Sequence, residues 1–87
     1  SSAASDVYKR QYLKCGIPVI ATKVHSLSYL EDYQCGILID DPAQINDAIN
    51  DIVHDYDNYA KNSYTCYETL WHPKKYLDKI YETFINK

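Results

Sequence analysis

Polar side chains that could contact a ligand directly follow two short apolar runs in this chain. Thr22, Lys23 and His25 follow the first run, and Asp40 and Asp41 follow the second. In open α/β sheets, ligands bind at the carboxyl ends of the strands, so these five residues are the best placed to reach one. One of the two aspartates could contact a ribose or a metal ion. Capping of the following helix already accounts for Asp41, and we favour that interpretation.

The three cysteines, Cys15, Cys35 and Cys66, are an odd number at wide spacing, which argues against a disulfide framework. No Cys-x-x-Cys motif occurs and no histidine lies at ligand spacing from a cysteine, so we expect no metal site. Buried free thiols in a reducing compartment are the favoured interpretation. A nucleophilic pair of Cys15 or Cys35 with His25 is a disfavoured alternative.

Phosphate-binding loops are excluded, because the chain has two glycines and lacks both G-x-G-x-x-G and the P-loop motif. It also lacks the G-x-S-x-G nucleophile elbow. Lys74 and Lys75 fall in the first turn of a predicted helix, where a positive charge is unfavourable. A solvated surface or a contact with another domain explains these two lysines.

The composition describes one small folded domain. The chain has 87 residues, of which 46% are hydrophobic and 24% charged, and its net charge is −3. This balance argues against general binding of nucleic acid or anionic lipid. No apolar run approaches the roughly 20 residues that span a bilayer, and the first eleven residues lack the apolar core of a signal peptide.

Two predicted strands position the polar residues named above. Residues 17–22 and 36–39 are continuous apolar runs, which is typical of strands that are buried on both faces in a parallel sheet. The connection of about a dozen residues suits a parallel crossover with a short helix, capped by Ser26 or Ser28. Two strands alone leave unpaired edges and uncovered faces. We therefore expect a slice of a larger α/β protein.

Four longer helical segments accompany the strands. The first starts at Ser5 or Asp6 and ends at Gly16, and the second starts at Asp41-Pro42. The third is capped by Asp55 or Asp57, and the last starts at Pro73. Their predicted buried faces are, in order, Val7, Tyr8, Tyr12 and Leu13; Ile45, Ala48, Ile49, Ile52, Val53 and Tyr56; Ala60, Tyr64, Tyr67 and Trp71; and Tyr76, Leu77, Ile80, Tyr81, Phe84 and Ile85.

Three segments in a fixed order carry a family pattern: Lys14-Cys15-Gly16-Ile17-Pro18-Val19-Ile20-Ala21-Thr22, then Cys35-Gly36-Ile37-Leu38-Ile39-Asp40-Asp41-Pro42, then Ala48-Ile49. Together they resemble the C-terminal part of a GT-B fold glycosyltransferase, most closely the nucleotide-sugar-dependent group often called family 4. The resemblance implies that residues 12–87 are the C-terminal part of a Rossmann-like nucleotide-sugar-binding domain, with two parallel strands followed by helices.

The family transfers a sugar from a nucleotide-sugar donor to a glycan or lipid-linked acceptor, usually without a catalytic metal. The resemblance implies a cytoplasmic parent enzyme with a further N-terminal acceptor domain, and any contact with the inner face of the membrane would belong to that missing half. The fragment alone should be inactive, and the resemblance implies no cofactor besides the donor. Residues 1–11 open with a small, polar and aperiodic stretch, and we expect them to be at least in part foreign to the parent protein.

Two departures from the family pattern leave the donor site unassigned. The family's paired glutamates, separated by seven residues, fall on Ala3 and Gln11, and its glycine- and glutamate-containing loop falls on residues 25–29. We therefore assign no catalytic or donor-contacting residue. A nucleotide-sugar 2-epimerase of related fold and a small α/β module that binds a protein through tyrosine-rich helices are the alternatives.

Overall fold

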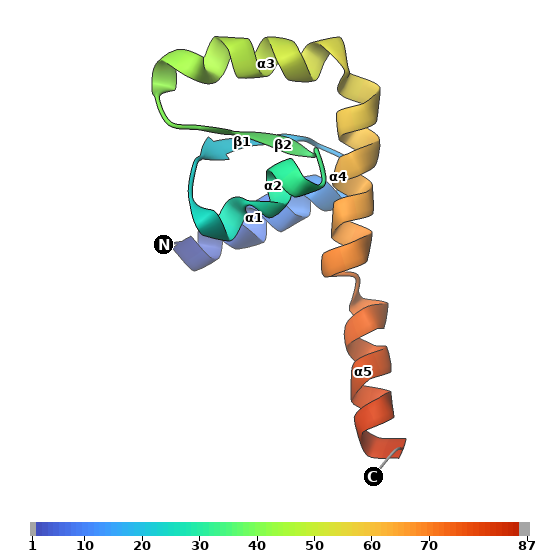
Figure 1. The fold of residues 1–87 in the computed structure, drawn as a ribbon. Helices are drawn as coiled ribbons and strands as arrows, with labels where there is room; N and C mark the ends of the chain where they lie inside the picture. The colour runs from blue at the N-terminus through green and yellow to red at the C-terminus, as the bar shows by residue number, and fades with distance from the viewer. Residues whose placement is uncertain (1, 86–87) are drawn as a thin grey trace.

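The computed structural model describes residues 2–85, with the side chains of residues 7–75 and 77–85. The chain forms two strands and a series of helices and 3-10 turns, the latter labelled η (Figure 1). In order, they are α1 (Ser2–Lys14), β1 (Val19–Thr22), η1 (His25–Leu27), α2 (Tyr29–Asp32), β2 (Gly36–Ile39), η2 (Pro42–Gln44), α3 (Ile45–His54), α4 (Tyr56–Leu70) and α5 (Pro73–Ile85).

The two strands pair in parallel, which confirms the predicted mixed α/β class. The register runs from Val19 opposite Gly36 to Thr22 opposite Ile39. Hydrogen bonds from the Val19 and Lys23 amides, to the carbonyl oxygens of Cys35 and Ile39, extend the pairing at both ends. Strand β1 begins two residues later than predicted, directly after Pro18, whose missing N–H cannot join a ladder.

Gly16 ends α1 as predicted, with a positive φ of 74°. The Gly16 amide donates to the carbonyl of Leu13, and the Ile17 amide donates to the carbonyl of Tyr12. This pair of bonds satisfies two terminal carbonyls of the helix in a Schellman motif. The chain thereby turns directly from α1 into β1.

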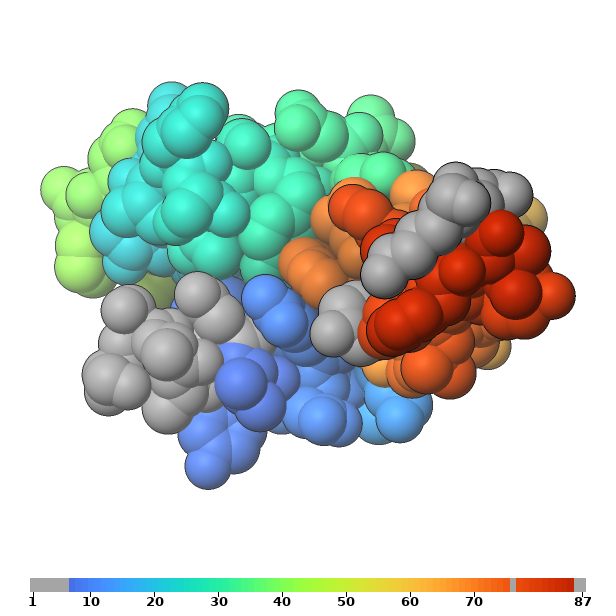
Figure 2. Space-filling view, turned by 90° about the horizontal axis from the view of Figure 1, so that it is seen from below, coloured from blue at the N-terminus to red at the C-terminus, as the bar shows by residue number. Residues whose placement is uncertain are grey.

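Helices cover both faces of the strand pair (Figure 1). Helix α3 lies over one face, α1 and α2 lie over the other, and α4 crosses the end of the pair. The core lies on the α1–α2 side and consists of Leu13, Val19, Leu27, Leu30, Cys35 and Cys66. Seen from below, α1 and the η1–α2 segment lie side by side, and α5 projects at one end (Figure 2).

The predicted buried face of α1 is wrong except for Leu13, which is fully buried. Val7, Tyr8 and Tyr12 are exposed, because α1 packs with one side against α4 and β1. The helix also begins at Ser2, before the predicted caps at Ser5 or Asp6.

Helices α3 and α4 bury narrower faces than their apolar patterns predict. On α3, Ala48 and Ile52 are buried against the strands, whereas Ile45, Ile49 and Val53 are exposed. Tyr56, the last residue of the predicted stripe, is the first residue of α4 and is also exposed. Within residues 2–85 the sheet has two strands, which are too narrow to cover a broad helical stripe. On α4, Ser63 and Cys66 are buried. Of the predicted face, Ala60, Tyr67 and Trp71 are half-buried, with Tyr67 and Trp71 packed against the core, whereas Tyr64 is exposed.

Helix α5 begins at Pro73 as predicted and extends away from the other elements (Figure 1). Its predicted apolar face is exposed at Leu77, Ile80, Tyr81, Phe84 and Ile85, while the Tyr76 side chain lies outside the described set. Among the described residues, no helix combines the length and the apolar character needed to cross a membrane.

Candidate functional site

The carboxyl ends of β1 and β2 form a small hollow, as the sequence predicts for a parallel pair. The hollow has a volume of about 160 Å³ and is lined by Thr22, Ile39, Asp40, Asp41, Pro42 and Ile45. The register places Thr22 opposite Ile39, so the polar residues that follow each strand meet at one edge. This confirms the predicted juxtaposition of Thr22 with Asp40 and Asp41.

A capping network occupies much of this edge. Asp41 Oδ1 accepts a hydrogen bond from the Ala43 amide at 2.9 Å. Gln44 Oε1 accepts from the amides of Asp40 at 2.7 Å and Asp41 at 3.0 Å. This reciprocal arrangement is a capping box, which confirms the favoured interpretation of Asp41 as a helix cap.

Asp40 is the carboxylate that this network leaves available. Its side chain is exposed and makes no hydrogen bond or ion pair with residues 2–85. Together with the Thr22 hydroxyl, it offers one acceptor and one donor–acceptor group to a ligand in the hollow. Such a pair suits the hydroxyl groups of a sugar or ribose better than a phosphate, since none of the lining side chains is cationic.

Lys23 and His25 follow β1 but do not line the hollow. Both side chains are exposed, and His25 lies in the η1 turn, which leads the chain away from the sheet edge. The sequence therefore overestimated how many residues after β1 converge on this site. Among the described residues, no group of three or more histidine, cysteine or acidic side chains could hold a metal ion.

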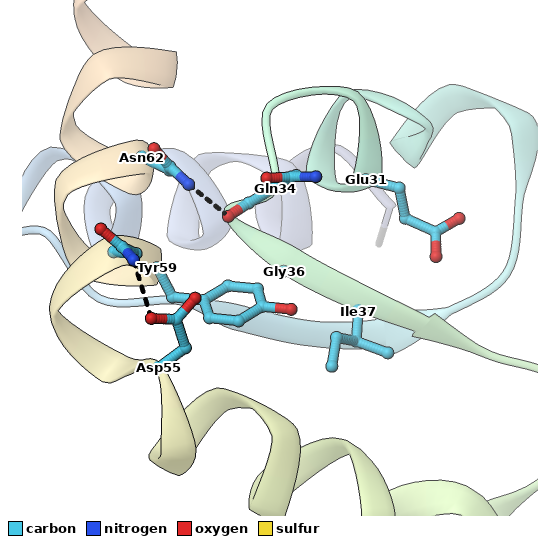
Figure 3. A pocket seen from close by; sticks show the side chains of 8 residues that line it. Glu31, Gln34, Gly36, Ile37, Asp55, Tyr59 and Asn62 are labelled. Carbon is cyan, nitrogen blue, oxygen red and sulfur yellow. Dashed lines mark hydrogen bonds between the residues drawn. The ribbon is translucent and has the colours of Figure 1, made fainter.

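A larger polar cavity lies at the opposite, amino end of β2 (Figure 3). Its volume is about 580 Å³, and α2, β2 and α4 supply its lining, which consists of Glu31, Gln34, Gly36, Ile37, Asp55, Asn58, Tyr59 and Asn62. Sequence reasoning missed this cavity. Its one sequence signal is the run of polar residues at helical spacing on α4: Asp55, Asn58 and Asn62.

Hydrogen bonds give the walls of this cavity a structural role. Asn62 Nδ2 donates to the Gln34 carbonyl at 3.1 Å, and Asn58 Nδ2 donates to Asp55 Oδ1 at 2.8 Å. The first bond ties α4 to the turn before β2, where Gln34 has a positive φ of 53°. The cavity is thus a seam between α4 and the strand pair.

The Tyr59 side chain extends from α4 across this seam toward β2 (Figure 3). Burial raises the pKa of Tyr59 above its usual value, and the nearby carboxylates of Asp51, Asp55 and Glu31 raise it further. Tyr59 therefore stays neutral at physiological pH and acts as a packing group with a polar tip.

The favoured interpretation of buried free thiols is confirmed for Cys35 and Cys66, whose side chains are both fully buried. The disfavoured alternative, a nucleophilic pair of Cys35 with His25, is wrong, because Cys35 lies in the core and His25 is exposed. All three cysteines are free, as predicted, but Cys15 is exposed at the end of α1 and not buried. Among the described residues, no hydrogen bond or ion pair joins Cys15 to His25.

Lys75 has a structural explanation that the sequence did not suggest. Its ammonium group donates to the carbonyl of Thr69 in the last turn of α4. A cation there offsets the negative end of the helix dipole and satisfies a terminal carbonyl. Lys74 is exposed, and its amide donates to His72 Nδ1 at 3.0 Å, which helps to begin α5.

Side chains at the junction of α4 and α5 form an aromatic cluster. The rings of Tyr29 and Trp71 meet edge to face with centroids 5.0 Å apart, and the Arg10 guanidinium lies 5.1 Å from the Trp71 ring centroid. The cluster joins Arg10 of α1 and Tyr29 of α2 to Trp71 at the end of α4.

Ligands of open α/β sheets bind at the carboxyl ends of the strands, so the best candidate site is the hollow at this edge, with Thr22 and Asp40 as its free polar groups. The larger cavity is a polar seam between elements. Comparisons of the chain with protein-family models, with curated proteins and with solved structures found no match.

Proposed function

We propose that residues 12–87 form the C-terminal part of the nucleotide-sugar-binding domain of a GT-B fold glycosyltransferase. The observation that carries the proposal is the parallel pairing of its two motif segments. The Gly16-Ile17-Pro18-Val19-Ile20-Ala21-Thr22 segment lies beside Gly36-Ile37-Leu38-Ile39, in register from Val19 to Thr22. That is the arrangement that the resemblance requires of these two segments.

Exposed apolar surface on several elements supports the view that this unit packs against more protein. Tyr12, Ile17, Ile49 and Val53 each expose 44% or more of their surface. They lie on α1, before β1 and on α3, so no single helix explains them. In the proposed enzyme, further strands and helices of the same domain extend the two-stranded sheet and cover part of this surface.

The donor site in this proposal includes the hollow at the carboxyl edge. Asp40 and Thr22 face the hydroxyl groups of the nucleotide sugar there, while the phosphate contacts come from parts of the enzyme outside this chain. The acceptor, a glycan or lipid-linked precursor, binds to the N-terminal domain. The 87-residue chain alone transfers no sugar, because it lacks that domain.

The test uses the full-length enzyme with a panel of uridine, guanosine and adenosine diphosphate sugars. Release of nucleoside diphosphate together with a new glycosidic product is the result we expect. An epimerised nucleotide sugar, without transfer, would instead identify the 2-epimerase alternative. Absence of both activities and of any donor binding would overturn the proposal.

A matched pair of variants tests the role of the hollow. Asp40→Ala removes the free carboxylate, and the loss of one hydrogen bond to a charged group should weaken donor binding by roughly tenfold or more. Asp32→Ala removes an exposed carboxylate on α2 that lies outside the hollow, and it should leave donor binding unchanged. Equal effects of the two variants would remove the hollow from the donor site.

A further inference from the structure

Two buried free thiols, those of Cys35 and Cys66, lie in the same core cluster without being joined. Cys35 directly precedes β2, and Cys66 lies in the middle of α4. Both side chains are fully buried, and both belong to the same core cluster. They are 31 positions apart in the chain, so their meeting is a product of the fold.

Three hydrogen bonds fix the backbone of Cys35, and one of them comes from α4. The Cys35 amide donates to the Leu30 carbonyl at 2.9 Å, and its carbonyl accepts from the Val19 amide at 3.2 Å. The same carbonyl accepts from Ser63 Oγ at 3.4 Å. Because Ser63 lies one helical turn before Cys66, the turn that carries the second thiol is fixed beside the first.

The two thiols also influence each other's titration. The neighbouring Cys66 raises the pKa of the Cys35 thiol and burial raises it further, while the neighbouring Cys35 lowers the pKa of the Cys66 thiol. Either thiol can act as the nucleophile once an oxidant reaches it.

We propose that Cys35 and Cys66 are a redox clasp, in which oxidation by a small disulfide such as glutathione disulfide joins them into a bond that ties the start of β2 to α4. The proposal stands on the burial, the shared core position and the fixed backbone of the two residues. It does not depend on the proposed transferase function.

The reaction proceeds in two thiol–disulfide exchanges. The thiolate of one cysteine attacks one sulfur of glutathione disulfide, which forms a mixed disulfide at that cysteine and releases one glutathione thiolate. The sulfur of the other cysteine then attacks the protein sulfur of the mixed disulfide, forms the Cys35–Cys66 bond and releases the second glutathione thiolate. The two thiol protons pass to the two glutathione leaving groups. The protein pair is oxidised by two electrons, and one glutathione disulfide is reduced to two glutathiones.

Burial makes the disulfide between Cys35 and Cys66 slow to form. Glutathione disulfide reaches Cys66 when α4 separates locally from β2, so the rate of closure follows that opening. Cys15 is exposed and reacts without any opening, but it has no neighbouring thiol and forms a mixed disulfide only. The closed clasp should in turn suppress the separation of α4 from β2.

The experiment uses the protein with Cys15→Ser, incubated with glutathione disulfide in the absence of urea and then unfolded, alkylated and mapped by mass spectrometry. We expect a cross-linked peptide pair that contains Cys35 and Cys66, a loss of two hydrogens and full reversal by dithiothreitol. Hydrogen exchange of the amides in α4 should slow in the oxidised protein. The control is the same protein with Cys66→Ser, in which glutathione disulfide should leave amide exchange in α4 unchanged.

Two results would overturn the proposal. In the first, Cys35 and Cys66 are still alkylated after unfolding, although the glutathione disulfide has fully modified Cys15 in the parent protein. In the second, the cross-link forms only in urea, which would mean that the folded thiols cannot be joined. Should Cys66→Ser fail to fold, the peptide map and the exchange rates of the Cys15→Ser protein still decide between these outcomes.

Discussion

Substitution of Gly36 by alanine should destabilise the strand pair strongly. A Cβ at this position would lie 2.2 Å from the Val19 carbonyl oxygen and 3.3 Å from Leu30 Cβ. An ordinary carbon–oxygen contact is about 3.3 Å or more, so the strands must separate by roughly 1 Å. Val19 is the register partner of Gly36, and that separation strains the first hydrogen bonds of the ladder. Overpacking and weakened hydrogen bonds together should cost about 3 kcal/mol.

Gly16→Ala is the matched control, since Gly16 has room for a Cβ. The nearest atom would be the Ala60 carbonyl oxygen at an ordinary 3.5 Å, so its cost comes from the positive φ of 74°. That cost is about 1 kcal/mol. Urea unfolding of the chain, followed by the fluorescence of its single tryptophan, Trp71, measures both variants. A Gly36→Ala variant no less stable than Gly16→Ala would refute the close packing of the two strands at this point.

Three further predictions concern single side chains. Asp41→Ala removes the acceptor for the Ala43 amide and should lower the free energy of unfolding by about 1 kcal/mol, as urea unfolding will measure, with Asp41→Asn close to wild type. Ser63→Ala removes a buried hydroxyl whose single proton is shared between the Tyr59 carbonyl oxygen at 2.8 Å and the more distant Cys35 carbonyl oxygen at 3.4 Å, and should cost about 1 kcal/mol in the same assay; an unchanged stability would show that this shared hydrogen bond does not contribute. Folding raises the pKa of Tyr59, so the stabilisation that comes from its neutral hydroxyl is present below the unfolded pKa near 10 and is lost as the pH rises further. The free energy of unfolding of Tyr59→Phe should therefore fall less than that of the wild type between about pH 9.5 and 11, as urea unfolding at each pH will measure.

Local signals predicted the elements of this fold well. Gly16 ends α1, the Asp41-Pro42 pair begins the next helical segment, and Pro73 begins α5, because caps and proline act within one turn of the chain. The continuous apolarity of the two runs also predicted parallel strands, since a buried strand needs no alternation.

Contacts between elements were harder to predict, because they depend on which surface a neighbour covers. The α4 stripe was assigned to Tyr64, yet the smaller Ser63 and Cys66 face the core, where α4 crosses close to Cys35. Tyr67 and Trp71 of the predicted face pack only at the border of this core, and the sequence pattern alone does not show where the helix crosses it. The exposed apolar residues of α3 were predicted as buried for the same reason, because the pattern does not report the width of the sheet beneath.

The two cavities differ in how far the sequence could predict them. The hollow beside Thr22 and Asp40 follows from two strands that end at one edge, which is a consequence of parallel pairing. The seam around Tyr59 needs three elements to meet, and the contact of Cys35 with Cys66 needs the placement of α4. Neither the seam nor the cysteine pair produces a residue spacing in the sequence that could have been recognised.

The proposed membership of the glycosyltransferase family is tested most directly by sequencing the natural transcript upstream of the Tyr12 codon. The account predicts two glutamates separated by seven residues, in the places that Ala3 and Gln11 occupy in this chain. A natural transcript that encodes Ala3 and Gln11 themselves, with no glutamate at either place, would contradict it.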